Sequence, residues 1–304
     1  METRVTVRAR RLPSIAPPTK LLAVNANLAQ RRLVDATMAS LIAICALLGV
    51  LVLVIILSYV AMRGLPALDL AFFTQRPLPY GEVGGGVAPA IVGSLTMLLV
   101  ASAIGLPVGI GAAIYLSEYG RGPFGSLVRF LTDVMSGLPS IVVGVFVWAF
   151  LVRGVVGSYA GLAGGVALAL IMIPIVTRTV EEVLQLVPDP LREASLALGV
   201  PRWKTILFVV LPAARAGIVT GVVLSMARAG GETAPLLLTA LGNQFFSFDL
   251  LQPMAALPIQ IYNYAVSPYD DWHTKAWGGA FVLIALIGAL SLLTRFAARR
   301  GQGG

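Results

Sequence analysis

The sequence is poor in charged residues. Asp, Glu, Lys and Arg make up 12% of its 304 residues, whereas 58% are hydrophobic. Soluble domains usually carry about 25% charged residues, which they need to cover their surface in water. This composition, together with a mean hydropathy of +0.88, excludes an ordinary soluble domain and indicates a protein embedded in lipid.

Cysteine and histidine are almost missing as well. The single Cys45 lies in an apolar run, so no intrachain disulfide can form. The single His273 stands beside Asp270 and Asp271 in a loop, without a nucleophile motif or metal-ligand spacing around it. These absences disfavour a hydrolase and predict that the chain holds no metal.

A phosphate-binding loop for ATP is also missing. The motif G-x-x-x-x-G-K-[S/T] does not occur, and Lys20, Lys204 and Lys275 each follow Thr or Trp. We therefore expect no cofactor in this chain and no ATP hydrolysis by it. The net charge of +8 is not a nucleic-acid signal either, because the basic residues cluster at the ends of apolar runs.

The sequence contains apolar runs long enough to cross a bilayer, which takes about 20 residues of helix. We predict an all-α, polytopic membrane bundle with six spans, near residues 36–62, 88–116, 134–152, 154–177, 216–240 and 276–294. Pro107, Pro139 and Pro174 are expected to kink or break their helices. Glycines four residues apart, such as Gly105 and Gly109, are expected to permit close helix packing.

Lysine and arginine are distributed unevenly between alternate loops. Seventeen lie in the two tails and the loops near 118–130 and 178–215, four lie in the other loops, and Arg228 lies inside a span. By the positive-inside rule both termini are cytoplasmic in a cell membrane. The predicted organisation is a basic N-terminal tail over 1–35 that contacts membrane lipid, a six-span membrane domain over 36–297, and a cytoplasmic tail over 298–304.

The loop over about 186–212, called the elbow below, carries the most specific pattern. A short helix is predicted after Pro190, with Glu193 in its first turn, where the helix dipole favours a carboxylate. Gly199 can end that helix in a left-handed conformation, and Pro201 prevents its continuation. A second helix is expected over Thr205 to Leu211, stopping at Pro212.

The elbow resembles the EAA loop of ABC-importer permeases. That loop reads Glu-Ala-Ala, three residues, Gly, nine residues, then Ile-x-Leu-Pro; Glu193-Ala194-Ser195, Gly199, Val209 and Leu211-Pro212 keep this spacing, with Ser for the second Ala and Val for Ile. The resemblance implies a type I, MetI-like permease whose elbow docks on a separate ATPase subunit that binds ATP and Mg. It assigns ATPase coupling to the residues Arg192, Glu193, Ala194 and Gly199.

Two charges, Arg228 and Glu232, lie inside the fifth predicted span. Charges in the bilayer are costly, so such residues usually face a cavity or a partner and serve function. They stand four apart and can pair on one helix face, with Gly230-Gly231 loosening the helix between them. The alternative is a buried salt bridge that only fixes packing.

Two further charged groups lie near the cytoplasmic ends of spans. Arg178, Glu181 and Glu182 end the fourth span, where snorkelling to the interface explains them as well as function does. Arg129 and Asp133, again four apart, are interpreted as a structural pair.

The cargo is suggested by a second resemblance. The run Ala227 to Leu237 is similar to the A-R-x-x-G-E-T-A-P-L-L segment of PstA-type permeases of bacterial phosphate ABC importers, and shorter matches extend over about 80–295. These are Gly84–Ala88, Ala90–Gly93, Gly137–Ser140 and Val176–Thr179.

That resemblance implies several partners: a homologous second permease, two ATPase subunits, an extracytoplasmic phosphate-binding protein, and phosphate itself. It also implies that Arg178, Arg228, Glu232 and Thr233 bear on phosphate passage. A hydroxyl in a span often only bonds its own helix, which is the alternative for Thr233. Two rival functions are a permease for molybdate, sulfate or an amino acid, and a secondary carrier driven by an ion gradient.

Overall fold

The computed structural model describes residues 19–82 and 84–300, and this part of the chain is built from helices without a named strand. It divides into two units, one ending at Ser58 and one beginning at Tyr59. The elements are α1 (Thr19–Gly64), a 3₁₀ turn (Leu65–Ala67), α2 (Leu70–Thr74), α3 (Ala88–Glu118), α4 (Pro123–Gly137), α5 (Ser140–Val147), a π-helix (Trp148–Val156), α6 (Gly161–Gln185), α7 (Asp189–Ala197), α8 (Arg202–Thr205), a second π-helix (Ile206–Val210), α9 (Leu211–Gly230), α10 (Ala234–Thr239), α11 (Leu257–Ala265) and α12 (Asp270–Arg300).

The first unit is formed by most of α1. This helix begins at Thr19, well before the uncharged run at residue 36, and residues 1–18 of the predicted basic tail lie outside the described residues. Its apolar side chains between Leu33 and Leu57 are exposed, as expected of a helix whose surroundings are lipid or another chain.

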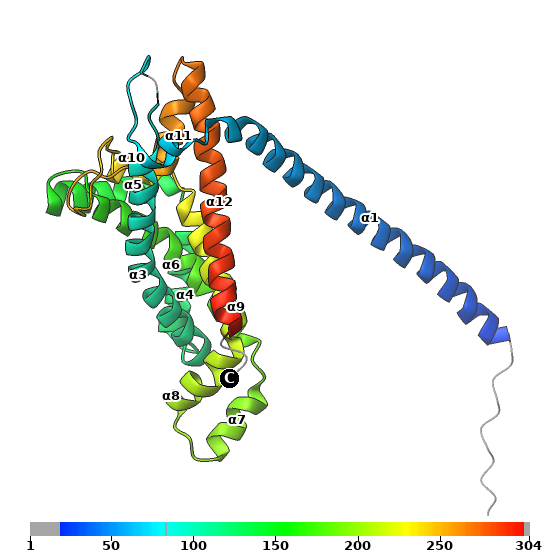
Figure 1. Cartoon of the computed structure of the whole chain (residues 1–304). Helices are drawn as coiled ribbons and strands as arrows, with labels where there is room; N and C mark the ends of the chain where they lie inside the picture. Colours follow the sequence, from blue (N-terminus) through cyan, green and yellow to red (C-terminus); the bar gives the residue numbers. More distant parts are fainter. Residues whose placement is uncertain (1–18, 83, 301–304) are drawn as a thin grey trace, which may run out of the picture. The chain divides into compact units, whose positions relative to one another are not determined.

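The second unit is a bundle in which α3 and α6 lie side by side, α9 packs against α6, and α12 packs against α9 and α11 (Figure 1). The α3–α6 contact depends on glycine, because a Cβ on Gly109 would lie 2.9 Å from the Cβ of Val176. Thr177 donates a hydrogen bond across the same contact to the carbonyl of Gly109 (3.2 Å). The close packing predicted from the spacing of Gly105 and Gly109 is therefore confirmed.

The loop between α10 and α11 covers the start of α6. The first amides of a helix have no partner within it. Here Gly161 N donates to the carbonyl of Gln252 (3.0 Å), and Leu162 N donates to that of Leu250 (2.7 Å). This loop also adds Met254 and Ala256 to a core shared by α3, α6 and α10.

Five helices of the described chain are long and apolar enough to span a membrane, and a sixth span is possible across a bent pair. The third predicted span, over 134–152, is wrong in its limits, because these residues belong to two helices that meet at a break. The chain forms α4 up to Gly137 and turns by 104° before α5. Pro139 stands at this break, before the first residue of α5, so its expected effect on the helix is confirmed. Pro107 and Pro174 are instead accommodated inside α3 and α6.

The predicted fifth span over 216–240 is also wrong in its limits. One helical segment runs from Arg202 to Gly230, and α10 is a separate short helix. Gly230-Gly231 favours the end of α9, and Pro235 fits the first turn of α10, where its missing amide is not needed. The α10 helix packs on α5, where a Cβ on Gly144 would come within 2.7 Å of the Cα of Pro235.

Candidate functional site

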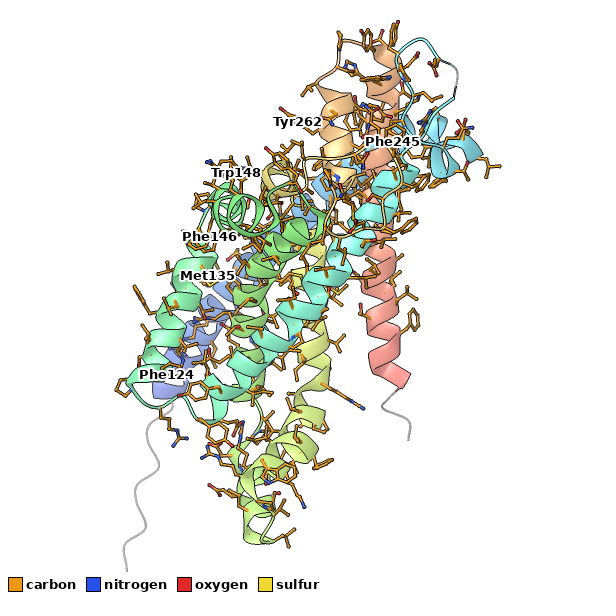
Figure 2. The ribbon with its side chains drawn as sticks, turned by 90° about the vertical axis from the view of Figure 1, so that its left-hand side faces the viewer. Phe124, Met135, Phe146, Trp148, Phe245 and Tyr262 are labelled. Atoms are coloured by element: carbon orange, nitrogen blue, oxygen red, sulfur yellow. The ribbon has the colours of Figure 1, made fainter. Side chains whose placement is uncertain are left out.

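A cavity of about 100 Å³ lies where three helices are irregular. It adjoins the α4–α5 break, Pro174 inside α6, and the last turn of α9, which carries Arg228. The hydroxyl-bearing residues Ser136 and Ser140 line it, and Arg228 supplies the charge among its described lining residues. Figure 2 shows this side of the bundle, with Met135, another lining residue, near the top of α4.

Arg228 and Glu232 form the expected pair, but across a helix end rather than along one helix. The distance from Arg228 Nε to Glu232 Oε1 is 3.6 Å, and the side chains are 60% and 15% exposed. Gly231 N and Glu232 N donate to carbonyls three residues back, so these amides are used in the turn that ends α9. The pair is long for a hydrogen bond, and the guanidinium therefore keeps donors for another oxygen.

Thr233 lies next to this pair, at the residue preceding α10. It is half-buried, and its carbonyl accepts a hydrogen bond from Leu237 N (3.1 Å). Its position outside a spanning helix differs from the expectation that placed it within the fifth span.

Arg178 lies one turn nearer the elbow on the face of α6 that lines the cavity. Its guanidinium contacts Glu182 Oε1 (2.9 Å) and Asp133 Oδ1 on α4 (3.4 Å), and all three side chains are more than half exposed. The predicted pairing of Arg129 with Asp133 is wrong, because Arg129 instead contacts Glu181 (2.7 Å). The spacing could not reveal this, since α4 and α6 offer closer partners than a neighbour on the same helix.

The predicted pathway residues thus form two groups. Arg228, Glu232 and Thr233 meet at the α9–α10 corner, whereas Arg178 belongs to the cluster with Asp133 and Glu182. Ile171, Pro174 and Ile175 line the cavity from α6. Residues three and four apart share a helix face, so this line of residues continues into Arg178.

The elbow folds as a helix, a turn and a helix. Its first helix, α7, begins at Asp189 with Pro190 in the first turn, so Glu193 falls in the second turn and not in the first as predicted. Gly199 has φ +77°, which confirms the left-handed end, and Pro201 precedes α8. Glu193, Ala194 and Gly199 are exposed.

The second helix of the elbow does not stop at Pro212, as the sequence predicted. It passes through the π-helix Ile206–Val210 directly into α9. A π-helical turn is wider than an α-helical turn and commonly interrupts α-helices at functional sites. The wider turn just before Pro212 relieves the clash between its ring and the preceding turn.

Ser195, which stands where the EAA pattern has its second alanine, has a partner that the sequence did not reveal. Its Oγ lies 2.9 Å from Thr205 Oγ1, and both residues are buried. The bond joins α7 to α8 and fixes the bend at Gly199. The sequence offered one signal for this contact, namely two hydroxyl residues ten positions apart on either side of the turn.

We expect Ser195→Ala to destabilise the elbow by about 1 kcal/mol, because it leaves the buried hydroxyl of Thr205 without this partner. Ser195→Ala/Thr205→Val removes both hydroxyls and should recover most of that loss. The measurement is the proteolysis rate at the elbow in the purified protein; equal rates in wild type and Ser195→Ala would contradict the expectation.

A second and larger cavity, of about 560 Å³, lies at the end of the bundle opposite the elbow. Uncharged polar groups line it, among them Gln244, Gln260 and Asn263. Burial raises the pKa of the Tyr264 hydroxyl, which also lines this cavity. This cavity therefore offers amides and hydroxyls without a fixed charge at neutral pH.

His273 contacts residues near it in the chain. Its Nε2 lies 2.7 Å from the carbonyl of Ser267, and its Nδ1 lies 3.9 Å from Asp270 Oδ1. Within residues 19–82 and 84–300, no group of three or more His, Cys, Asp or Glu is placed to hold a metal ion.

Comparison with known proteins identifies the class to which this arrangement of spans and elbow belongs. The family described as "Binding-protein-dependent transport system inner membrane component" matches residues 105–300, and the chain belongs to this family. It is a multi-pass membrane permease of the ABC-importer type.

Particular relatives extend the match over nearly the whole chain. The "Phosphate transport system permease protein PstA" of Pasteurella multocida (strain Pm70) is 45% identical over 89% of this chain and 96% of its own length. The protein of the same name from Mycobacterium leprae (strain TN) is 37% identical over 96% and 99%.

Two solved structures share the fold. A chain of the inward-facing MetNI methionine ABC transporter has a TM-score of 0.53 and 22% identity, over 71% of this chain and 92% of that chain. A chain of an amino acid ABC transporter crystallised with histidines has a TM-score of 0.51 and 18% identity, over 70% and 94%. Together they confirm the MetI-like, all-α fold.

Proposed function

We propose that this chain is one of two permease subunits of an importer that takes up inorganic phosphate and is driven by ATP hydrolysis on separate subunits. The observation that carries the proposal is 45% identity, over 89% of the chain, to a permease named for phosphate transport. The cavity that holds Arg228 agrees with it, since a planar guanidinium suits phosphate oxygens.

Phosphate would pass Arg228 on its way between the two permeases. Arg228 holds Glu232 loosely at 3.6 Å, so an arriving anion competes with a carboxylate already present. That competition limits how tightly phosphate is held, which a transport pathway requires for release. Arg178, held by Asp133 and Glu182, would meet the anion next, and Thr233 would add a hydroxyl beside Arg228.

The partners follow from the proposal. The exposed face of the elbow, with Glu193, Ala194 and Gly199, docks on one of two ATPase subunits, which bind ATP and Mg. An extracytoplasmic binding protein delivers phosphate at the opposite end. The excess of Lys and Arg in the elbow and tails orients both termini and the elbow toward the cytoplasm.

The test is reconstitution in liposomes with the second permease, the ATPase subunits and the binding protein. We expect ATP-dependent uptake of radiolabelled phosphate, with sulfate, molybdate and amino acids taken up at least about tenfold more slowly, because a selectivity of that size needs only 1.4 kcal/mol. Preference for another solute would assign the permease to that cargo. Uptake that persists without the ATPase subunits would instead indicate a secondary carrier.

A further inference from the structure

Two buried carboxylates lie where the electrostatics of a helix disfavours them. Glu118 is the last residue of α3, and Glu181 lies in the last turns of α6; they are 7% and 4% exposed. Both helices end at the elbow, so their negative dipole ends lie on the same side of the bundle (Figure 1). Acidic groups in this position need compensation from positive charge.

Arg129 of α4 supplies one half of that compensation. Its Nε contacts Glu181 of α6 at 2.7 Å. Its two terminal nitrogens donate to the carbonyl of Leu116 in the last turn of α3 (2.8 Å) and to that of Gly120, two residues beyond the end of α3 (2.9 Å). One guanidinium thus holds the carboxylate of α6 and the backbone end of α3.

Arg192 of the elbow makes the reciprocal set of contacts. Its Nη2 and Nε lie 3.1 and 3.2 Å from Glu118 Oε1 of α3. It also donates to the carbonyls of Leu184 (2.8 Å) and Val187, at the end of α6. The side chain is only 17% exposed although α7 is a surface helix. Each arginine therefore joins α3 to α6 and ties both to its own helix.

We propose that Arg129 and Arg192 form a crossed brace, through which movement of the elbow is passed to α3 and α6 as one rigid unit and onward to α4. The inference rests on the proposed function, because it concerns how movement of the ATPase subunits is passed to the helices that line the phosphate pathway. Arg129 and Arg192 are positioning residues and do not contact the cargo.

The geometry shows why the covalent connection is insufficient. Three residues, Leu186 to Pro188, separate α6 from α7, and such a non-helical link can bend when α7 is pushed. Arg192 crosses this link, since it holds carbonyls on the α6 side and Glu118 on α3. The brace ends at α4, whose far end forms the break beside Arg228.

The test compares variants that weaken the brace without stranding a buried charge. Arg192→Lys keeps the charge but loses the planar fork, and Glu118→Gln/Arg192→Gln removes both charges together. Arg121→Gln is the matched control, because it removes an exposed arginine from the same loop region. Each is assembled into the complete importer in liposomes, and phosphate uptake and ATP hydrolysis are measured in parallel.

We expect both brace variants to assemble and hydrolyse ATP at the wild-type rate or faster, while phosphate transported per ATP falls about tenfold, the effect of losing roughly one charge-assisted hydrogen bond. Arg121→Gln should keep the wild-type ratio. An unchanged amount of phosphate transported per ATP, whether or not both rates fall, would overturn the brace. A wild-type complex that transports no phosphate would instead overturn the proposed function.

A second measurement does not depend on transport. Spin labels are placed at the exposed positions Ala197 on α7 and Phe124 on α4, after Cys45→Ala. With the brace intact, the distance between the labels should stay the same when ATP binds. In Arg192→Lys it should broaden or shift. A nucleotide-dependent distance change in the wild type, as large as in the variant, would refute the rigid unit.

Discussion

Arg228→Gln is expected to lower phosphate uptake by about 100-fold or more, with the importer still assembled. Glutamine removes the charge while keeping a polar side chain. Two charge-assisted hydrogen bonds to phosphate, at about 1.5–3 kcal/mol each, account for a loss of that size. The measurement is the initial rate of ATP-dependent phosphate uptake by reconstituted importer, normalised to the amount of assembled complex.

Two further variants make the result specific. Arg228→Gln/Glu232→Gln removes the carboxylate that would otherwise lose its partner and should show the same defect, which separates transport from folding. Arg153→Gln removes an arginine that stacks on Trp148 away from the cavity and should transport normally. Normal uptake by well-assembled Arg228→Gln would remove this residue from the pathway.

Glu193→Arg is expected to release the ATPase subunits from the permease and to reduce uptake at least about 30-fold. Glu193 is exposed on the elbow, in the segment that resembles the EAA loop. Disrupting one charge pair at an interface costs about 2–5 kcal/mol, and charge reversal adds repulsion. Copurification of the ATPase subunits with a tagged permease measures docking directly.

The matched control for this reversal is Glu82→Arg, an exposed carboxylate at the opposite end of the bundle. It should leave copurification of the ATPase subunits unchanged, because it lies far from the elbow. Retention of the ATPase by Glu193→Arg at wild-type levels would show that the elbow docks through other residues.

The elbow was predictable because its signals are local. Gly199 permits a left-handed residue and Pro201 prevents further helix, and each of these effects acts within one turn of the chain. The predicted stop at Pro212 failed for the opposite reason. Whether a proline ends a helix depends on the width of the preceding turn, and the π-helical Ile206–Val210 accommodates it.

The bent third span shows that apolar composition can predict a membrane segment without predicting its direction. Residues 134–152 carry no charge, so hydropathy could not distinguish a straight span from a chain that turns by 104° at Leu138-Pro139. The proline was recognised, but the direction after it is set by α10 packing on α5 through Gly144. That contact joins residues about ninety positions apart.

The charged groups of the site also divide into those with local partners, which the sequence predicted, and those with distant partners, which it did not. The Arg228–Glu232 pair was predicted from its spacing of four, since both residues belong to one short segment. The partners of Arg129 and Arg192 lie 52 and 74 residues away and depend on α3 and α6 packing together. Spacing alone gave Arg129 the wrong partner, and the resemblance assigned Arg192 to docking without its contact to Glu118.

The π-helix Ile206–Val210 sets the rotation of α9 about its own axis. A turn of this kind contains about one residue more than an α-helical turn, and one residue corresponds to about 100° around the axis. Every side chain beyond it, up to Arg228, is turned by that angle relative to an uninterrupted helix starting at Arg202. This rotation determines which face of α9 turns toward the cavity, and Arg228 lies on that face. The wide turn over Ile206–Val210 that sets the rotation lies some 30 Å from Arg228, at about 1.5 Å per residue.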